Sequence, residues 1–168
     1  MVSGWGATKR DGVSLAWRDF GGDGLPVLLL HGLAGQAEEW TQTASWLTAR
    51  AHVVAPDARG HGRSERQPED VSHATTAEDA AFVIRQAGLG PAVVVGQSLG
   101  GLTALRLTAR HPELVRGVVL IEASPNGRDD RRAEELAAAV GTGLRSWPVP
   151  FASPGCCVAA HSPALFPC

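Results

Sequence analysis

One short stretch of the sequence, VVVGQSLGG at residues 93–101, carries a serine between two glycines. It stands where a β-branched run gives way to leucines at helical spacing. A strand, then Gly-x-Ser-x-Gly, then a helix is the context of a nucleophile elbow, a strained turn that lifts a serine hydroxyl above the edge of a sheet. The glycines let strand and helix approach closely. Ser98 is therefore the candidate nucleophile, and the N–H of Leu99 at the helix start is one candidate oxyanion donor.

A second glycine-containing loop, HGLAG, directly follows another apolar run. Ligand sites in open α/β sheets lie beyond the carboxyl ends of the strands, so this loop and Ser98 are expected to face one crevice. The N–H of Leu33 is then the natural second oxyanion donor. Gly32 and Gln97 are predicted to contact the substrate. We interpret His31 as a packed histidine that ties down the loop rather than as a catalytic base.

The elements that must position these residues follow from the hydropathy pattern. Continuous apolar runs, typical of strands buried on both faces of a parallel sheet, alternate with stretches of helical spacing. An alternating segment, Val13–Phe20, precedes them and predicts an exposed-edge antiparallel strand. The order predicts an α/β fold with a doubly wound, mostly parallel sheet, helices on both faces and right-handed crossovers. The expected buried strands cover residues 27–30, 52–55, 92–95 and 117–121, and the expected helices cover about 37–50, 75–88 and 99–111.

The composition changes late in the chain. From Ser146 to Cys168 there is no Asp, Glu, Lys or Arg, while five prolines and all three cysteines occur there. Neither helical nor strand periodicity survives such a density of prolines. The sequence therefore predicts a globular core over residues 1–150 and an irregular, disordered tail over 151–168. Without a partner from the tail, Val118–Ile121 would be an exposed sheet edge.

Composition and charge exclude several classes of partner. The net charge is −2, with 15 basic and 17 acidic residues mixed along the chain, so no nucleic-acid or membrane partner is expected. The longest apolar run is far shorter than the roughly 20 residues of a membrane span, and the N-terminus lacks a signal-peptide layout, which predicts a cytoplasmic protein. Three cysteines without an export signal predict free thiols, and adjacent Cys156 and Cys157 lack the spacing of a zinc site. No GxGxxG fingerprint follows a predicted strand, so neither a metal nor a cofactor is expected, and the oligomeric state stays open.

Three motifs, in this order and at these separations, resemble the α/β-hydrolase family, in the branch that holds esterases, epoxide hydrolases and cofactor-free haloperoxidases. The resemblance covers about residues 10–150 and implies a small-molecule substrate with an ester-like or other acyl bond. It also implies that the middle motif is a structural turn whose Asp57, Arg59 and His61 brace a loop. The motifs are HGLAG at residues 31–35, PDARGHGRS at 56–64 and GQSLGG at 96–101.

A serine nucleophile needs a general base, and in this family an acid and then a histidine follow the serine. After Ser98 the only histidines are His111 and His161. The first ends the predicted helix, about 20 Å from the serine at 1.5 Å per residue, and the second lies in the uncharged tail. Glu122 stands where some family members place the acid; alternatively, it only braces the crevice.

The family pattern continues with a lid and two further strands, so the resemblance implies a hydrolase truncated after its sixth strand. The sequence predicts a serine hydrolase that is inactive if its histidine base is missing. The alternative is a non-catalytic hydrolase fragment or pseudoenzyme that binds a small apolar ligand or a partner. The particular acyl substrate cannot be ranked from the sequence, because specificity in this family depends largely on the lid.

Overall fold

The computed structural model describes residues 3–123, 145–146 and 156–160. Its strands are β1 (Gly4–Arg10), β2 (Val13–Gly21), β3 (Leu25–Leu30), β4 (Ala51–Pro56), β5 (Ala92–Gln97), β6 (Val115–Ile121), β7 (Arg145–Ser146) and β8 (Cys156–Ala160). Its helices are α1 (Thr41–Leu47), α2 (His73–Gln86) and α3 (Leu99–Arg110), with short 3₁₀ turns η1 (Ala37–Trp40) and η2 (Pro112–Leu114). Each strand and helix that the apolar runs predicted is present, within a few residues of the expected bounds.

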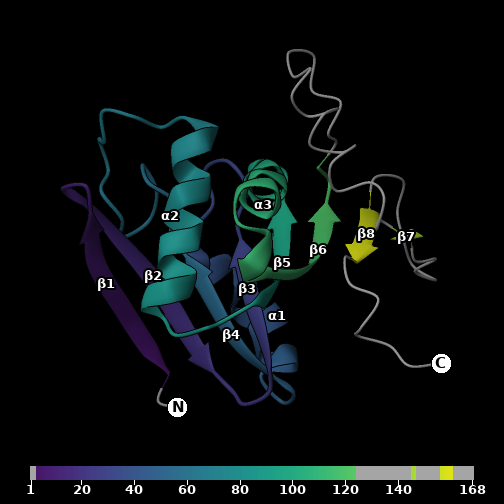
Figure 1. Cartoon of the computed structure of the whole chain (residues 1–168). Helices are drawn as coiled ribbons and strands as arrows, with labels where there is room; N and C mark the ends of the chain where they lie inside the picture. The colour runs from purple at the N-terminus through teal and green to yellow at the C-terminus, as the bar shows by residue number, and fades with distance from the viewer. Residues whose placement is uncertain (1–2, 124–144, 147–155, 161–168) are drawn as a thin grey trace.

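The strands form one sheet in the order β1-β2-β4-β3-β5-β6-β8-β7 (Figure 1). The four central strands, β4, β3, β5 and β6, run parallel, while β2 lies antiparallel to both of its neighbours. The carboxyl ends of the central strands therefore meet at one edge of the sheet, as the sequence predicted.

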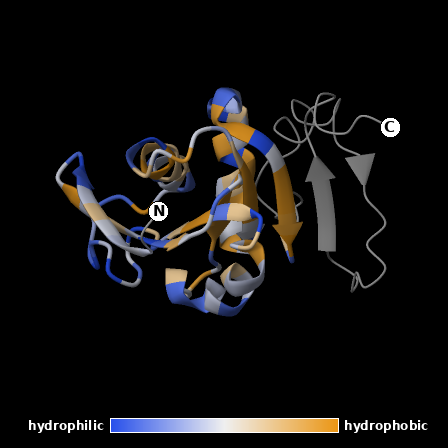
Figure 2. Ribbon diagram, turned by 90° about the horizontal axis from the view of Figure 1, so that it is seen from below, coloured by the Kyte–Doolittle hydropathy of each residue, from blue (hydrophilic) through white to orange (hydrophobic). Residues whose placement is uncertain are grey.

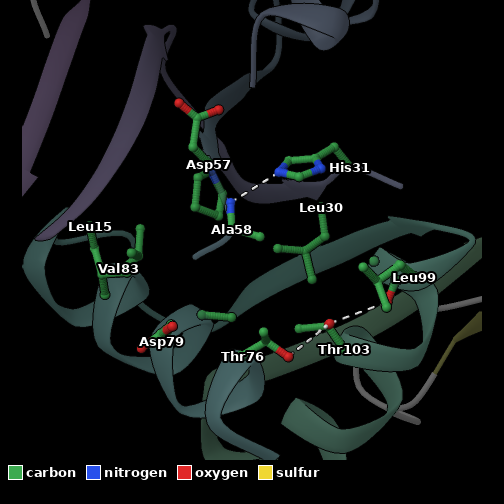
Figure 3. Close-up of a pocket in the computed structure, with 13 residues that line it drawn as sticks. Leu15, Leu30, His31, Asp57, Ala58, Thr76, Asp79, Val83, Leu99 and Thr103 are labelled. Carbon is green, nitrogen blue, oxygen red and sulfur yellow. Dashed lines mark hydrogen bonds between the residues drawn. The ribbon is translucent and has the colours of Figure 1, made fainter. Parts of the chain in front are cut away.

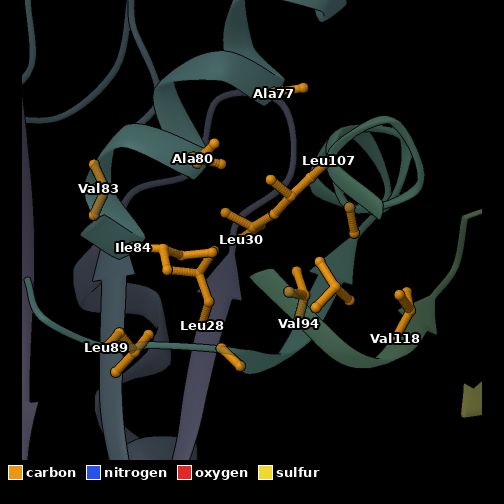
Figure 4. Packing of buried hydrophobic residues seen from close by; sticks show 14 of the residues in the cluster. Leu28, Leu30, Ala77, Ala80, Val83, Ile84, Leu89, Val94, Leu107 and Val118 are labelled. Atoms are coloured by element: carbon orange, nitrogen blue, oxygen red, sulfur yellow. The ribbon is translucent and has the colours of Figure 1, made fainter. Parts of the chain in front are cut away.

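The sheet separates two apolar cores because alternate residues of each central strand point to opposite faces. On one face, α2 and α3 pack on Leu28, Val94 and Val118 (Figure 4). On the other face, Val27, Leu29 and Val53 pack beneath η1 and α1. Figure 2 shows that the central strands are mainly hydrophobic, whereas the helices on the two sides of the sheet mix hydrophobic and hydrophilic residues. The predicted α/β architecture with helices on both faces is confirmed.

The sequence missed β1, and Val13–Phe20 is not the edge strand it was predicted to be. This segment lies in β2, which pairs with β1 on one side and β4 on the other. Glycines and basic residues give β1 a weak strand pattern. The missed signal was the Asp11-Gly12 pair, whose positive φ angles of 50° and 82° form a two-residue hairpin between Arg10 and Val13.

The predicted exposed edge at Val118–Ile121 is also wrong. Strand β8 pairs antiparallel with β6, with Val118 opposite Ala159 and Ile121 opposite Cys156. Cys156–Ala160 has a run of small and β-branched residues between the prolines, which is long enough for a short strand, so this part of the tail is not irregular. Residues 147–155 and 161–168 lie outside the described part, and the division of the chain at residue 150 stays a prediction. Among the described residues, no helix is both long enough and apolar enough to cross a membrane.

Candidate active site

Ser98 occupies the turn between β5 and α3 and has φ 48° and ψ −111°. A non-glycine residue rarely adopts a positive φ, so surrounding contacts must hold this backbone in place. The N–H of Ser98 donates to the carbonyl oxygen of Ile121 on β6 (2.9 Å), and its own carbonyl accepts from Gly101 (2.9 Å). The side chain is exposed. This is the geometry that the Gly-x-Ser-x-Gly pattern predicted.

The glycines beside Ser98 are required by space. A Cβ on Gly96 would lie 2.4 Å from the carbonyl oxygen of Gly100, and a Cβ on Gly100 would lie 2.3 Å from that of Leu30. Both obstacles are backbone atoms of packed elements, which cannot move aside cheaply. The start of α3 therefore lies directly against the carboxyl ends of β3 and β5.

Gly100→Ala is expected to lower the free energy of unfolding by about 1–3 kcal/mol through overpacking against the Leu30 carbonyl, despite the higher helix propensity of alanine. Urea unfolding measures it. The control is Gly4→Ala, because a Cβ there meets nothing within 4 Å, and a surface change of this kind is expected to stay within about 0.5 kcal/mol. Equal stability of the two variants would contradict the close approach.

The loop His31–Gly35, here called the oxyanion loop, lies against the elbow. A Cβ on Gly32 would lie 3.6 Å from the Cβ of Ser98 and 3.7 Å from the carbonyl oxygen of Gln97, which is ordinary van der Waals contact. The loop is closed by a turn in which the N–H of Gly35 donates to the carbonyl oxygen of Gly32 (3.1 Å). The expectation that this loop and Ser98 share one crevice agrees with these contacts.

An open depression of about 350 Å³, the Ser98 depression, contains the serine. Leu33, Leu99 and Glu122 line it as well, so the structure brings four of the six predicted site residues together. Gly32 and Gln97 adjoin the elbow but do not belong to the lining. The complete lining is Leu33, His73, Ser98, Leu99, Leu102, Glu122 and Ala123.

His73 is a lining residue that the sequence reasoning missed. It is the first residue of α2, directly after Ser72, whose side chain caps the helix by accepting from the N–H of Thr75 (3.3 Å). A helix that follows a parallel strand begins at the carboxyl edge of the sheet, and a Ser-His pair at a helix start was the available signal. Glu122, which also lines the depression, has φ 50°, so its backbone too is held in the left-handed region.

A smaller cavity of about 40 Å³ lies beneath the elbow, between α2, α3 and the sheet (Figure 3). Thr76, Thr103 and His31 contribute polar groups to its lining. The Thr103 hydroxyl donates to the carbonyl oxygen of Leu99 (3.2 Å) and so tightens the first turn of α3. Ser98 does not line this cavity, whereas it lines the larger depression, so the Ser98 depression is the candidate substrate site.

The middle motif supports the oxyanion loop from below, in agreement with the loop-bracing role that the resemblance implied. Buried Asp57 accepts the N–H groups of Ala37 (2.7 Å) and Arg63 (2.8 Å). The buried Arg59 guanidinium donates two hydrogen bonds to Asp79 on α2, and this contact raises the pKa of Arg59. We call residues 57–64 the Asp57 turn.

His31 is packed rather than exposed to substrate. Its Nε2 accepts from the N–H of Ala58 (3.0 Å), and its Nδ1 lies 2.7 Å from the carbonyl oxygen of Gly32. Burial lowers the pKa of His31 below its ordinary value of 6.5, and the nearby His61 contributes in the same direction, although the Gly32 carbonyl opposes them. The neutral imidazole is therefore the form that the folded chain holds.

This lowered pKa predicts a loss of stability in acid. As the pH falls, the unfolded chain binds a proton at His31 before the folded chain does, so the contribution is complete above about pH 6.5 and is lost below it. Urea unfolding at about pH 8 and about pH 5 measures the loss. His31→Gln, which cannot titrate, is expected to be less stable at the higher pH but to lose less on acidification. An equal loss in both proteins would contradict the prediction.

His111 lies at the other end of α3 from Ser98, where it caps the helix and its Nε2 lies 3.0 Å from the Glu78 carboxylate. It is a surface and cap residue, as predicted. His161 lies outside the described residues. The described residues hold no group of three or more His, Cys, Asp or Glu side chains suited to a metal ion.

Comparison with known proteins places this geometry in a family. A family model described as alpha/beta hydrolase fold matches residues 26–149, well over half of the chain. The chain belongs to the α/β-hydrolase fold family. The resemblance inferred from the three motifs is thereby confirmed.

Relatives of this α/β-hydrolase chain include an esterase of Mycobacterium tuberculosis, 38% identical over 130 residues (77% of this chain and 42% of that protein). A non-heme chloroperoxidase of Streptomyces lividans is 37% identical over 121 residues (70% of this chain and 44% of that protein). Among solved structures, E-2-(acetamidomethylene)succinate hydrolase superposes with a TM-score of 0.68 at 30% identity, covering 87% of this chain and 54% of that one. The chain thus spans less than half the length of the curated relatives named here.

Proposed function

We propose that Ser98 is the nucleophile of a serine-type hydrolase that cleaves an ester-like acyl bond. The observation that carries the proposal is the strained backbone of Ser98, with φ 48°, at the strand-to-helix turn beside the depression. Strain of this kind persists only where packing enforces it, and here it exposes a hydroxyl at a helix N-terminus. The esterase relative supports the same class of reaction.

The reaction would proceed by acyl transfer. The Oγ of Ser98 forms a bond to the carbonyl carbon while a base accepts the hydroxyl proton. Collapse of the tetrahedral intermediate breaks the bond to the alcohol oxygen, which takes up that proton. Water then releases the acid by the same steps and regenerates the serine.

Two backbone donors would stabilise the oxyanion. Leu99 is the first residue of α3, so its N–H has no acceptor within the helix. The helix N-terminus adds the positive end of its dipole. The second donor is the N–H of Leu33 in the oxyanion loop, which contacts the elbow through Gly32. A preorganised donor of this kind contributes about 10²–10³-fold to the rate.

The depression suits a small acyl group. Its walls are apolar at Leu33, Leu102 and Ala123, while His73 and Glu122 supply polar groups at the same site. Apolar walls with few polar groups are typical of small-molecule sites. We propose that His73 contacts the substrate, and that Gly32 and Gln97 support the reacting end from the elbow.

The general base decides how fast this site turns over. His111 is engaged with Glu78 at the far end of α3. In the family pattern the base comes from a segment later in sequence than the described core. We therefore propose that the described core supplies the nucleophile and the oxyanion donors. The availability of a general base for the Ser98 proton then limits the rate.

The experiment supplies a general base from solution. A positioned base contributes about 10²–10⁴-fold, and free imidazole is expected to recover part of this, raising the Ser98-dependent hydrolysis of p-nitrophenyl acetate about tenfold. Ser98→Ala with the same imidazole gives the background to subtract. Ser45→Ala, an exposed serine on α1, is the matched control and is expected to behave as wild type. Identical rates for wild type and Ser98→Ala at every imidazole concentration would favour the non-catalytic alternative.

A further inference from the structure

Two histidines join the oxyanion loop to the Asp57 turn in a reciprocal arrangement. His31 of the loop accepts through Nε2 from the N–H of Ala58 in the turn (3.0 Å). His61 of the turn accepts through Nε2 from the N–H of Ala34 in the loop (3.3 Å). The two rings lie 5.1 Å apart between their centroids, at an interplanar angle of 55°. Each segment thus carries a histidine that accepts from the backbone of the other.

The hydrogen bonds fix the protonation state of both rings. A backbone N–H can only donate, so each Nε2 must be without a proton. The Nδ1 of His31 faces the carbonyl oxygen of Gly32 (2.7 Å), and that of His61 faces the carbonyl oxygen of Arg59 (3.1 Å). A carbonyl can only accept, so each Nδ1 carries the proton. Both imidazoles are therefore neutral. A further proton on the Nε2 of either ring would face the backbone N–H that now donates to it, and the hydrogen bond would be lost.

The His31 contact also sets the direction of the candidate oxyanion donor. The carbonyl of Gly32 and the N–H of Leu33 belong to one planar trans peptide, so they point in opposite directions. The carbonyl is held by Nδ1 of His31 and by the N–H of Gly35. The N–H of Leu33 must then point away from His31. His61 holds the next peptide, at Ala34, whose φ of 61° is in the strained left-handed region.

Asp57, Arg59 and Arg63, three of the charged groups around the pair, are engaged with other partners. Asp57 accepts two backbone N–H groups, and the Arg59 guanidinium pairs with Asp79. The guanidinium of Arg63 lies over the Trp5 ring. The Glu39 carboxylate lies against Gly35, and Glu39 and Asp57 act on His31 only as lesser charge effects that favour its protonation. Protonating one ring would place a positive charge 5.1 Å from the other ring, which opposes protonation of both.

We propose that His61 is a positioning residue for the oxyanion loop. With His31 it forms a histidine clasp, in which two Nε2 atoms without protons accept backbone N–H groups and so hold the Leu33 N–H toward the Ser98 depression. The catalytic meaning of the clasp rests on the proposed function of Ser98, but the clasp itself is a structural claim that can be tested without turnover.

The test is an NMR titration of the ¹⁵N-labelled 168-residue chain carrying Ser98→Ala, between about pH 8 and about pH 5, which brackets the ordinary histidine pKa. The amide resonance of Ala58 is expected to shift with the ring resonances of His31, and at about pH 8 the amide resonance of Ala34 is expected to move in His61→Leu, which removes its acceptor. His61→Gln keeps an acceptor near the Nε2 position, so at about pH 8 it is expected to retain the wild-type position of the Ala34 amide resonance. His52→Gln, whose ring pairs with Asp19 elsewhere, is the control and leaves the titration unchanged.

A second readout separates this proposal from the proposed function. At about pH 8 with imidazole present, His61→Leu is expected to slow fluorophosphonate labelling of Ser98 up to about 100-fold, and His61→Gln is expected to restore most of the rate. An Ala34 amide resonance that keeps its wild-type position in His61→Leu would overturn the clasp. If Ser98 is never labelled but the Ala34 amide resonance responds to the His61 variants as described, the clasp stands and the function proposed for Ser98 fails.

Discussion

Hydrolysis of p-nitrophenyl acetate by the 168-residue chain, without added imidazole, is expected to stay close to background, and Ser98→Ala is expected to change it little. Removing the base from a serine triad costs on the order of 10⁶-fold in kcat. That factor is about 8 kcal/mol of barrier, at about 1.36 kcal/mol per tenfold. The oxyanion donors and binding alone leave about 10³–10⁴-fold over water in such enzymes. Initial rates for both proteins, after subtraction of the buffer rate, give the comparison.

The variants that identify a rescuing base are His73→Ala and His161→Ala. His73 lines the Ser98 depression. His161 and His111 are the two histidines that follow Ser98 in the sequence. His111→Ala is the control, because its ring lies at the far end of α3. A large drop in Ser98→Ala, reproduced by one of the first two variants but not by the control, would show that the chain has a working base and that the low-activity prediction is wrong.

Asp79→Ala is expected to lower the free energy of unfolding by about 3–5 kcal/mol, because it leaves the buried Arg59 guanidinium without its carboxylate partner. Both side chains of this pair are almost fully buried, at 3% and 8% exposure. Asp79 also accepts from Arg10 on β1 (2.8 Å), so one carboxylate joins β1, the Asp57 turn and α2. Urea unfolding measures the change.

Glu113→Ala is the matched control for that ion pair. Glu113 pairs with Arg85 at 3.4 Å, but both side chains are about half exposed, at 60% and 47%. Exposed pairs contribute about 0–1 kcal/mol, since water and salt screen them. If Asp79→Ala costs no more than Glu113→Ala, the claim that this buried pair anchors the Asp57 turn is incorrect.

The sequence determines the central sheet well because its signals are local. The short, continuous apolar runs at residues 27–30 and 92–95 are typical of strands in a buried parallel sheet, and the helices between them have clear spacing. The outer strands of the sheet were harder to predict from the sequence. Strand β1 depends on pairing through the Asp11-Gly12 turn rather than on its own hydropathy, and β8 is a short segment defined by its pairing with β6.

In the candidate site, too, the features with a local sequence pattern could be predicted, and those that depend on distant segments could not. Ser98 and its glycines form a local pattern, so their strained turn could be predicted from five residues. His73 and the histidine clasp depend on segments that the fold brings together. His61 reaches Ala34 across 27 residues of sequence, and no local pattern shows which nitrogen accepts or which carbonyl is held. The placement of Glu122 beside Ser98 was predicted, whereas its role as an acid stays a proposal.

The central claim is that Ser98 is the nucleophile, and mapping a covalent adduct tests it most directly. The chain is incubated with a fluorophosphonate and imidazole, digested with trypsin and analysed by mass spectrometry. Cleavage after Arg85 and Arg106 gives a peptide in which the only hydroxyl side chains are Ser98 and Thr103. We predict that the phosphonate is found on Ser98 of this peptide and is absent from the Ser98→Ala chain. A chain that stays unmodified there, or that takes up the same label after Ser98→Ala, would contradict the account.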